Sequence, residues 1–212
     1  MVGRNRNKPQ RCGGAERSIP CHLVRLCASA IRLLVVVPVL VCLPSFQATA
    51  QSGPTQDEVL RIAFPPPATI ERRTGFLTEA DLDRARMLAG PDVEVSQGVV
   101  TYYIARAGGE TIGVAYFDGH RVRSMHEVAM VVVGADNRVR QVEVLRFEEP
   151  PEYRASGPWL RQLEGKQLDS SLSLKAGVVN LTGATLTSRA LVRATRRVLA
   201  IHQVIDPFGS ER

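Results

Sequence analysis

The sequence lacks cysteine over most of its length. All four cysteines, Cys12, Cys21, Cys27 and Cys42, lie within the first 42 of its 212 residues. Residues 43–212 therefore contain no disulfide, no thiolate zinc site and no cysteine nucleophile. A body without thiols suits an oxidising compartment. Its stability has to come from an apolar core, which a body of about 160 residues can supply.

Residues 51–212 also lack an excess of charge of either sign. The formal net charge of the whole chain is +6, but residues 1–50 hold seven basic residues and one acid, so the rest is balanced. A balanced body has no general electrostatic field for a polyanion. No basic patch alternates with aromatic residues in the sequence. We therefore expect no nucleic-acid partner.

The beginning of the chain lacks an apolar run of membrane-spanning length. Its apolar stretch, Leu33–Leu43, is interrupted by Pro38 and is far shorter than the roughly 20 residues that a spanning helix needs. Basic residues precede this stretch, and Ala48-Thr49-Ala50 follows it as a small-residue cleavage site. We interpret residues 1–50 as a signal peptide cleaved near Ala50. This predicts a periplasmic or otherwise extracytoplasmic protein with possible membrane association, and a retained anchor is the alternative.

Residues 51–92 are expected to form an N-terminal helical segment. A polar linker over residues 51–56 leads to a helix over residues 57–64, which ends at three consecutive prolines. A second helix begins at Thr78, where an acid three residues later completes a capping pattern. Gly90-Pro91 ends that helix.

Residues 93–212 are expected to form the second part of the fold. Residues 93–147 alternate β-branched and aromatic residues with glycine-containing turns, which predicts three to five largely antiparallel strands. A short helix around Trp159 follows, and residues 186–204 have the spacing of a long amphipathic helix. The predicted fold class is therefore α+β, with a largely antiparallel sheet, flanking helices and a long C-terminal helix.

A loop rich in hydroxyl groups leads directly into this last helix. Residues 180–188 read NLTGATLTS. The first backbone N–H groups of a helix lack internal partners, and the helix dipole favours an anion there. Gly183 allows the backbone to approach a ligand closely, and the neighbouring hydroxyls can donate to phosphate oxygens. The segment predicts a phosphate site, and a capped helix start with surplus threonines is the alternative.

The same segment resembles the flavinylation motif of the FMN-binding domain family. The resemblance rests on seven consecutive residues: Thr182, Gly183, Ala184, Thr185, Leu186, Thr187 and Ser188. More loosely it extends over about residues 95–203. The family includes flavinylated components of the sodium-pumping NADH:quinone reductase and of the related ferredoxin-oxidising electron transport complex. The resemblance implies that residues 93–212 are an FMN-binding domain, that these seven residues bind FMN, and that Thr185 carries it through a phosphoester.

Two further expectations come with this resemblance. A separate magnesium-dependent flavin transferase attaches the cofactor, with FAD as the donor. Family members commonly have an acid six positions before the modified threonine, whereas this chain has Val179 there, with Asn180 beside it. Tight non-covalent FMN is the alternative to the phosphoester.

The resemblance predicts an electron carrier that serves membrane or periplasmic redox partners. The sequence shows neither a serine–histidine–acid spacing nor a glycine-rich dinucleotide motif, so we do not expect a self-sufficient enzyme. A flavin-dependent reductase of a small periplasmic substrate and a binding or sensory module without flavin are the alternatives.

Several other residues have less specific interpretations. We expect Trp159 and Tyr153 to be core or rim aromatics, with stacking on the flavin as the alternative. His120 and Arg121 are expected in a solvated turn, and the histidines make a poor ligand set for a metal. The arginines of the last helix, Arg189, Arg193, Arg196 and Arg197, are expected on its solvent-exposed face, where Arg189 can help to neutralise the phosphate.

Overall fold

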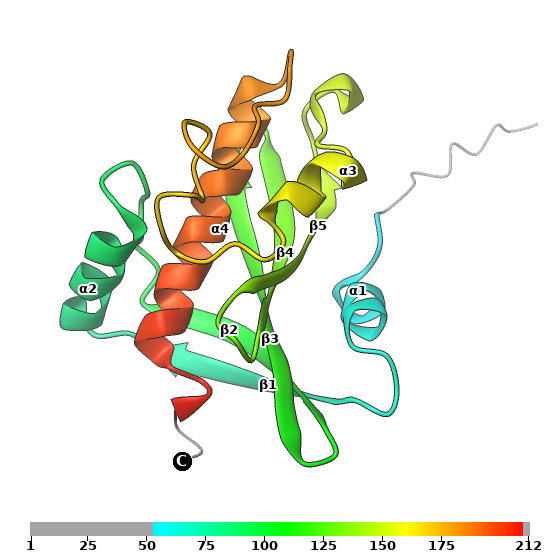
Figure 1. Cartoon of the computed structure of the whole chain (residues 1–212), viewed down its shortest axis with the longest axis vertical. Helices are drawn as coiled ribbons and strands as arrows, with labels where there is room; N and C mark the ends of the chain where they lie inside the picture. The colour runs from blue at the N-terminus through cyan, green and yellow to red at the C-terminus, as the bar shows by residue number, and fades with distance from the viewer. Residues whose placement is uncertain (1–52, 210–212) are drawn as a thin grey trace, which may run out of the picture. The chain divides into compact units, whose positions relative to one another are not determined.

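A five-stranded antiparallel sheet lies at the centre of the computed structural model, which describes residues 53–209 (Figure 1). The predicted signal peptide and its cleavage site lie outside the described residues. The strands run in the order β1-β2-β3-β4-β5 across the sheet. The elements are α1 (Gln56–Ala63), β1 (Thr69–Phe76), α2 (Glu79–Ala89), β2 (Val99–Ala107), β3 (Glu110–Arg121), β4 (His126–Gly134), β5 (Val139–Phe147), η1 (Pro151–Tyr153), α3 (Gly157–Leu160), η2 (Arg161–Leu163) and α4 (Thr185–Ile205).

Both faces of the sheet are covered by helices. α4 and α2 pack on one face, and α1 packs on the other (Figure 1). Side chains alternate between the two cores: Tyr116 and Val131 belong to the α4 side, whereas Ala115 and Met130 belong to the α1 side. β4 is buried on both faces, which explains its uninterrupted apolar sequence. The predicted α+β class is confirmed.

The edge strand β1 was not expected from the sequence. Its residues, TIERRTGF, are mostly exposed and include three charged side chains, so the strand lacks a continuous apolar signal. It pairs with β2 in the register Arg72↔Tyr103. The segment 51–92 therefore contributes a strand to the sheet as well as the two helices that were predicted. Both helices begin with capping boxes, at Thr55 and Thr78.

α4 is the long C-terminal helix that the periodicity predicts. Its buried positions include Leu191, Ala194, Val198 and Ile201. No helix within residues 53–209 combines the length and the apolar character needed to cross a membrane.

The expectation that all four arginines of this helix are solvent-exposed is wrong for Arg196 and Arg197. Both are only partly exposed. Arg196 donates from Nε to the carbonyl oxygen of Ala89 (2.8 Å), and Arg197 pairs with Asp118 of β3. Their long side chains fold across the surface of the helix and reach groups in α2 and the sheet, which a periodicity argument does not detect.

Candidate functional site at the start of α4

The seven residues of the motif form the turn that precedes α4 and its first turn. Gly183 has a φ of +82°, a conformation that glycine adopts without strain. No heavy atom lies within 4 Å of the position where a Cβ would stand at Gly183. The turn is therefore open on this side, and α4 begins two residues later at Thr185.

The side chains of the motif divide into an inward and an outward set. Thr187 and Ser188 are buried, and Thr187 Oγ1 donates to the carbonyl oxygen of Tyr153 (2.8 Å). Ser188 Oγ accepts the N–H of Leu181 (3.0 Å) and donates to the carbonyl oxygen of Ala184 (3.2 Å). These two hydroxyls hold the turn in place. The hydroxyls of Thr187 and Ser188 thus donate to backbone carbonyl oxygens, whereas the sequence predicted that they would donate to a phosphate.

The outward set presents the motif to solvent. Thr182, Thr185 and Leu186 are exposed to differing degrees, whereas Ala184 is buried beneath them. Asn180 Nδ2 donates a hydrogen bond to Thr185 Oγ1 (2.8 Å). The hydroxyl oxygen of Thr185 is therefore both accessible and held in one orientation. The sequence did not predict this role for Asn180, although the residue lies beside the motif.

The first turn of α4 has no side-chain cap. Ala184 occupies the N-cap position and makes no side-chain hydrogen bond, and the first turn contains no acid. Within residues 53–209, no hydrogen-bond acceptor is found for the N–H groups of Thr185, Leu186 and Thr187. By contrast, α1 and α2 both have capping boxes and acids in their first turns. The start of α4 thus offers unsatisfied donors and a favourable dipole to an external anion.

The chain before the motif is fixed through the backbone of Val179. Its N–H donates to Gln162 Oε1 (2.9 Å), and its carbonyl oxygen accepts the Nε1–H of Trp159 (2.7 Å). Trp159 is buried, as the core interpretation predicts, while the Val179 side chain is 72% exposed. Trp159 therefore anchors the stretch of chain that leads into the motif.

The largest of three clefts that meet at the start of α4 is lined by Thr185 itself. This large cleft has a volume of about 860 Å³ and lies between α4, the end of α2 and the loop around residues 170–176. Apolar side chains such as Val93, Leu172 and Leu174 line it. Its charged lining consists of four basic residues, Lys175, Arg189, Arg193 and Arg196, and one acid, Asp92. Its volume falls in the range of about 300–1,000 Å³ that small-molecule and cofactor sites occupy.

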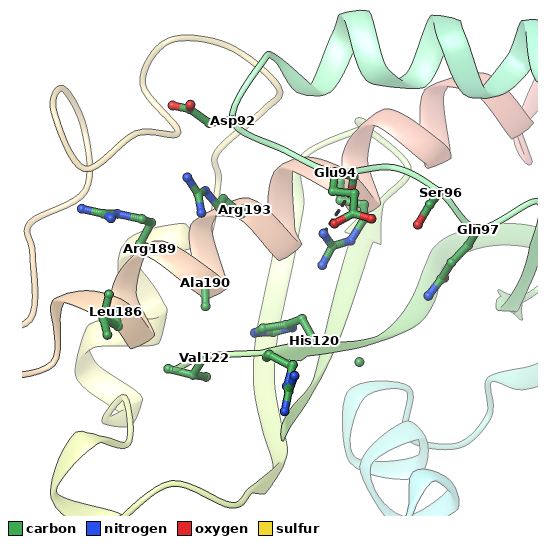
Figure 2. Close-up of a pocket in the computed structure, with 13 residues that line it drawn as sticks. Asp92, Glu94, Ser96, Gln97, His120, Val122, Leu186, Arg189, Ala190 and Arg193 are labelled. Atoms are coloured by element: carbon green, nitrogen blue, oxygen red, sulfur yellow. Dashed lines mark hydrogen bonds between the residues drawn. The ribbon is translucent and has the colours of Figure 1, made fainter. Parts of the chain in front are cut away.

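A second cleft, the arginine cleft, runs along the neighbouring side of α4 and is shown in Figure 2. It has a volume of about 560 Å³. Leu186, Arg189, Ala190 and Arg193 project from α4 on one side, and the loop bearing Asp92 and Glu94 lies opposite (Figure 2). Arg189 and Arg193 line both this cleft and the large cleft.

The small cleft, about 250 Å³ in volume, lies on the remaining side of the motif and contains a carboxylate. Glu149 Oε1 accepts the backbone N–H groups of Arg123 (3.2 Å), Ser124 (2.7 Å) and Met125 (2.8 Å). The hydrogen bonds from Ser124 and Met125 lower the pKa of Glu149. Tyr153 is the aromatic side chain at this cleft. The charged lining of the small cleft is therefore one acid, Glu149, and one base, Arg123, with no excess of positive charge for a phosphate.

His120 is not in a solvated turn as expected, because β3 continues through it to Arg121. Its side chain is only 9% exposed, and its two ring nitrogens lie 2.9 Å from Asp118 Oδ1 and 2.9 Å from Glu127 Oε2. Arg197 binds both oxygens of Asp118 at 2.7 Å. Burial alone would lower the pKa of His120, but the two carboxylates outweigh it and raise the pKa to about 9.

This buried network fastens α4 to β3 and β4. His120 is an imidazolium at neutral pH, and both of its N–H groups are occupied by protein carboxylates. It has no free ring nitrogen with which to exchange a proton with a ligand. Its place beneath the arginine cleft is therefore structural. Asp118 is only two residues from His120 in the sequence, whereas Glu127 and Arg197 lie on other elements and have no local sign in the sequence.

Comparison with known proteins was consistent with the motif. A comparison with curated proteins finds no match. Among solved structures, the crystal structure of NqrC from Shewanella oneidensis aligns with a TM-score of 0.49 and 17% sequence identity, covering 76% of this chain and 91% of that one. Residues 125–200, which include the entire motif, match the family model described as the FMN-binding domain. The resemblance of this chain to the FMN-binding domain family is thereby confirmed over residues 125–200.

Proposed function

We propose that this protein is an extracytoplasmic electron carrier whose FMN is joined to Thr185 through a phosphoester. The observation that carries the proposal is the exposed, oriented hydroxyl of Thr185 at the uncapped start of α4, within a segment that matches the FMN-binding domain. A phosphate attached to this oxygen lies beside the unpaired N–H groups of the first turn, where a helix stabilises an anion.

The charges around the motif favour the large cleft for the cofactor. The lining of this cleft has four basic side chains against one acid, whereas the small cleft has one basic side chain, Arg123, against one acid, Glu149. Arg189 is one turn beyond Thr185 and has no ion pair within the described residues. The apolar side chains deeper in the large cleft suit an aromatic ring. The phosphate and the ring of FMN can therefore both bind along the lining of the large cleft.

Covalent attachment agrees with an extracytoplasmic location. Outside the cytoplasm a dissociated cofactor is lost, whereas a tether makes rebinding intramolecular and keeps the local concentration high. The absence of cysteine from residues 43–212 and the signal-peptide pattern of residues 1–50 support export. A flavin transferase that uses FAD would be the maturation partner.

The site favours electron relay over self-sufficient catalysis. FMN itself supplies one- and two-electron chemistry, and the protein supplies binding and electrostatics. The clefts at the motif are open to solvent and offer no histidine with a free ring nitrogen, because both nitrogens of His120 are engaged. Membrane or periplasmic redox proteins would then be the donor and acceptor.

Two measurements on purified protein test this function. After co-expression with a flavin transferase, we expect the visible absorption of a bound flavin, which chemical reduction bleaches and an acceptor restores. Colourless protein would favour a binding module without flavin. Steady-state turnover with a donor and a small-molecule acceptor, without any protein partner, would instead identify a reductase. Cell fractionation tests the location, and a cytoplasmic pool of full-length protein would contradict export.

A further inference from the structure

We propose that Asn180 is the positioning residue for flavin attachment: its side-chain amide orients the Thr185 hydroxyl and stabilises the charge that develops on it. The inference rests on the proposed function, since it concerns the same oxygen atom. Asn180 Nδ2 donates to Thr185 Oγ1 at 2.8 Å, which is a well-formed hydrogen bond. No other side-chain donor to Thr185 Oγ1 is found within the described residues.

The structure fixes the backbone on both sides of Asn180. Val179 is held through its N–H by Gln162 and through its carbonyl oxygen by Trp159. Leu181 is held through its N–H by Ser188 Oγ of α4 (3.0 Å). Asn180 itself is exposed. With both neighbours fixed, the amide can reach Thr185 at little further cost in conformational entropy, and this is the requirement for a preorganised donor.

The attachment step explains why a donor is useful at this atom. Thr185 Oγ1 attacks the flavin-side phosphorus of FAD and forms an O–P bond, while the pyrophosphate P–O bond breaks and AMP leaves. The hydroxyl proton passes to a base of the transferase or to water, and no oxidant or reductant is consumed. Negative charge grows on Oγ1 as the proton departs. An N–H already aimed at that oxygen stabilises this charge without reorganisation.

The hydrogen bond from Asn180 to Thr185 also bears on Val179, which stands where family members commonly have an acid. Six positions before Thr185, where the family commonly has an acid, the exposed Val179 contributes its backbone as the anchor. The polar contact to the hydroxyl of Thr185 comes from the next residue, Asn180, five positions before Thr185. Asn180 carries no charge, so it does not repel the phosphates of the incoming FAD.

The test is the rate at which purified transferase attaches flavin to the purified protein in the presence of FAD and Mg²⁺, followed by intact mass. For Asn180→Ala we expect kcat/KM for the acceptor protein to fall about five- to tenfold, the range set by one exposed hydrogen bond. The loss should fall on kcat, with KM changed less than about twofold, because docking of the two proteins is unaffected. The variant should reach the same final extent of modification and keep its melting temperature.

Two further variants separate positioning from other roles. Asn180→Asp has nearly the same shape but no side-chain N–H, and we expect its rate of flavin attachment to fall at least as much as that of the alanine variant. Gln203→Ala removes an exposed amide from the far end of α4 and should react at the wild-type rate. An Asn180→Ala rate within twofold of wild type, a loss confined to KM, or a faster Asn180→Asp variant would overturn the inference. An unmodified wild type would instead overturn the proposed function, and the inference with it.

Discussion

Replacing His120 with glutamine tests whether the buried network stabilises the domain through the charge on its imidazole. His120 lies between Asp118 and Glu127, which are 8% and 0% exposed, and its pKa is raised from 6.5 to about 9. A rise of this size corresponds to about 3 kcal/mol in favour of the folded state while the imidazole is protonated in both states. Glutamine has similar length but no charge, so this contribution disappears.

The sign of the effect sets the pH window. Because the folded-state pKa is the higher one, the contribution is complete below pH 6.5 and declines as the pH rises through about 9. At pH 6, urea unfolding should show the His120→Gln variant to be about 3 kcal/mol less stable than wild type. At pH 9.5, above the folded-state pKa, most of the wild-type imidazole is neutral like the glutamine, so the difference in stability should fall below about 1 kcal/mol.

The control for this experiment is the other histidine at this end of the sheet. His126 is exposed, so His126→Gln should unfold at the wild-type urea concentration at both pH values. The reasoning is refuted if the difference between wild type and His120→Gln is the same at pH 6 and pH 9.5, since the contribution of His120 would then be packing alone.

Three further predictions concern the site itself. Gly183→Ala places a side chain at a φ of +82°, which costs about 1 kcal/mol of backbone strain. Calorimetry should therefore show a melting temperature lower by about 2–4 °C, and an unchanged melting temperature would refute the need for glycine at this position. Replacing Lys175 and Arg189 together with alanine should weaken non-covalent FMN binding by about tenfold in low salt and by less in high salt. The affinity is measured by titration calorimetry on protein without covalent flavin. An equal loss of affinity at both salt concentrations would contradict an electrostatic role for the large cleft. Trp159→Phe removes the hydrogen-bond donor to the carbonyl oxygen of Val179. The variant should lose about 1 kcal/mol of unfolding free energy, measured in urea, and should also acquire flavin more slowly. A normal rate of attachment would show that the hydrogen bond from Trp159 is dispensable.

The sequence predicts the elements that have a strong periodic or capping signal. The helix after Thr78, the antiparallel strands within residues 93–147 and the long C-terminal helix all form where they are expected. Edge strand β1 escaped prediction because it is exposed and charged, so its pairing with β2 depends on hydrogen bonds along the backbone. An edge strand of this kind has no period-2 apolar pattern to recognise.

The motif was recognisable because its residues are consecutive, whereas its supporting contacts are not. Asn180 contacts Thr185 across the turn that contains Gly183, in which the N–H of Ala184 donates to the carbonyl oxygen of Leu181. The partners of His120 lie on β3 and β4, and one of them, Asp118, in turn binds Arg197 of α4. Long side chains that bridge separate elements leave no local pattern. The sequence therefore identified the family of the segment but did not predict which of its hydroxyls face solvent.

The most direct test of the account is the intact mass of the purified protein after co-expression with a flavin transferase. We predict the addition of one FMN less one water in the wild type. The adduct should be absent from Thr185→Val and present in Thr182→Val, which alters the other outward-facing threonine of the motif. An adduct that persists in Thr185→Val, or a wild type that acquires none, would contradict attachment at the start of α4.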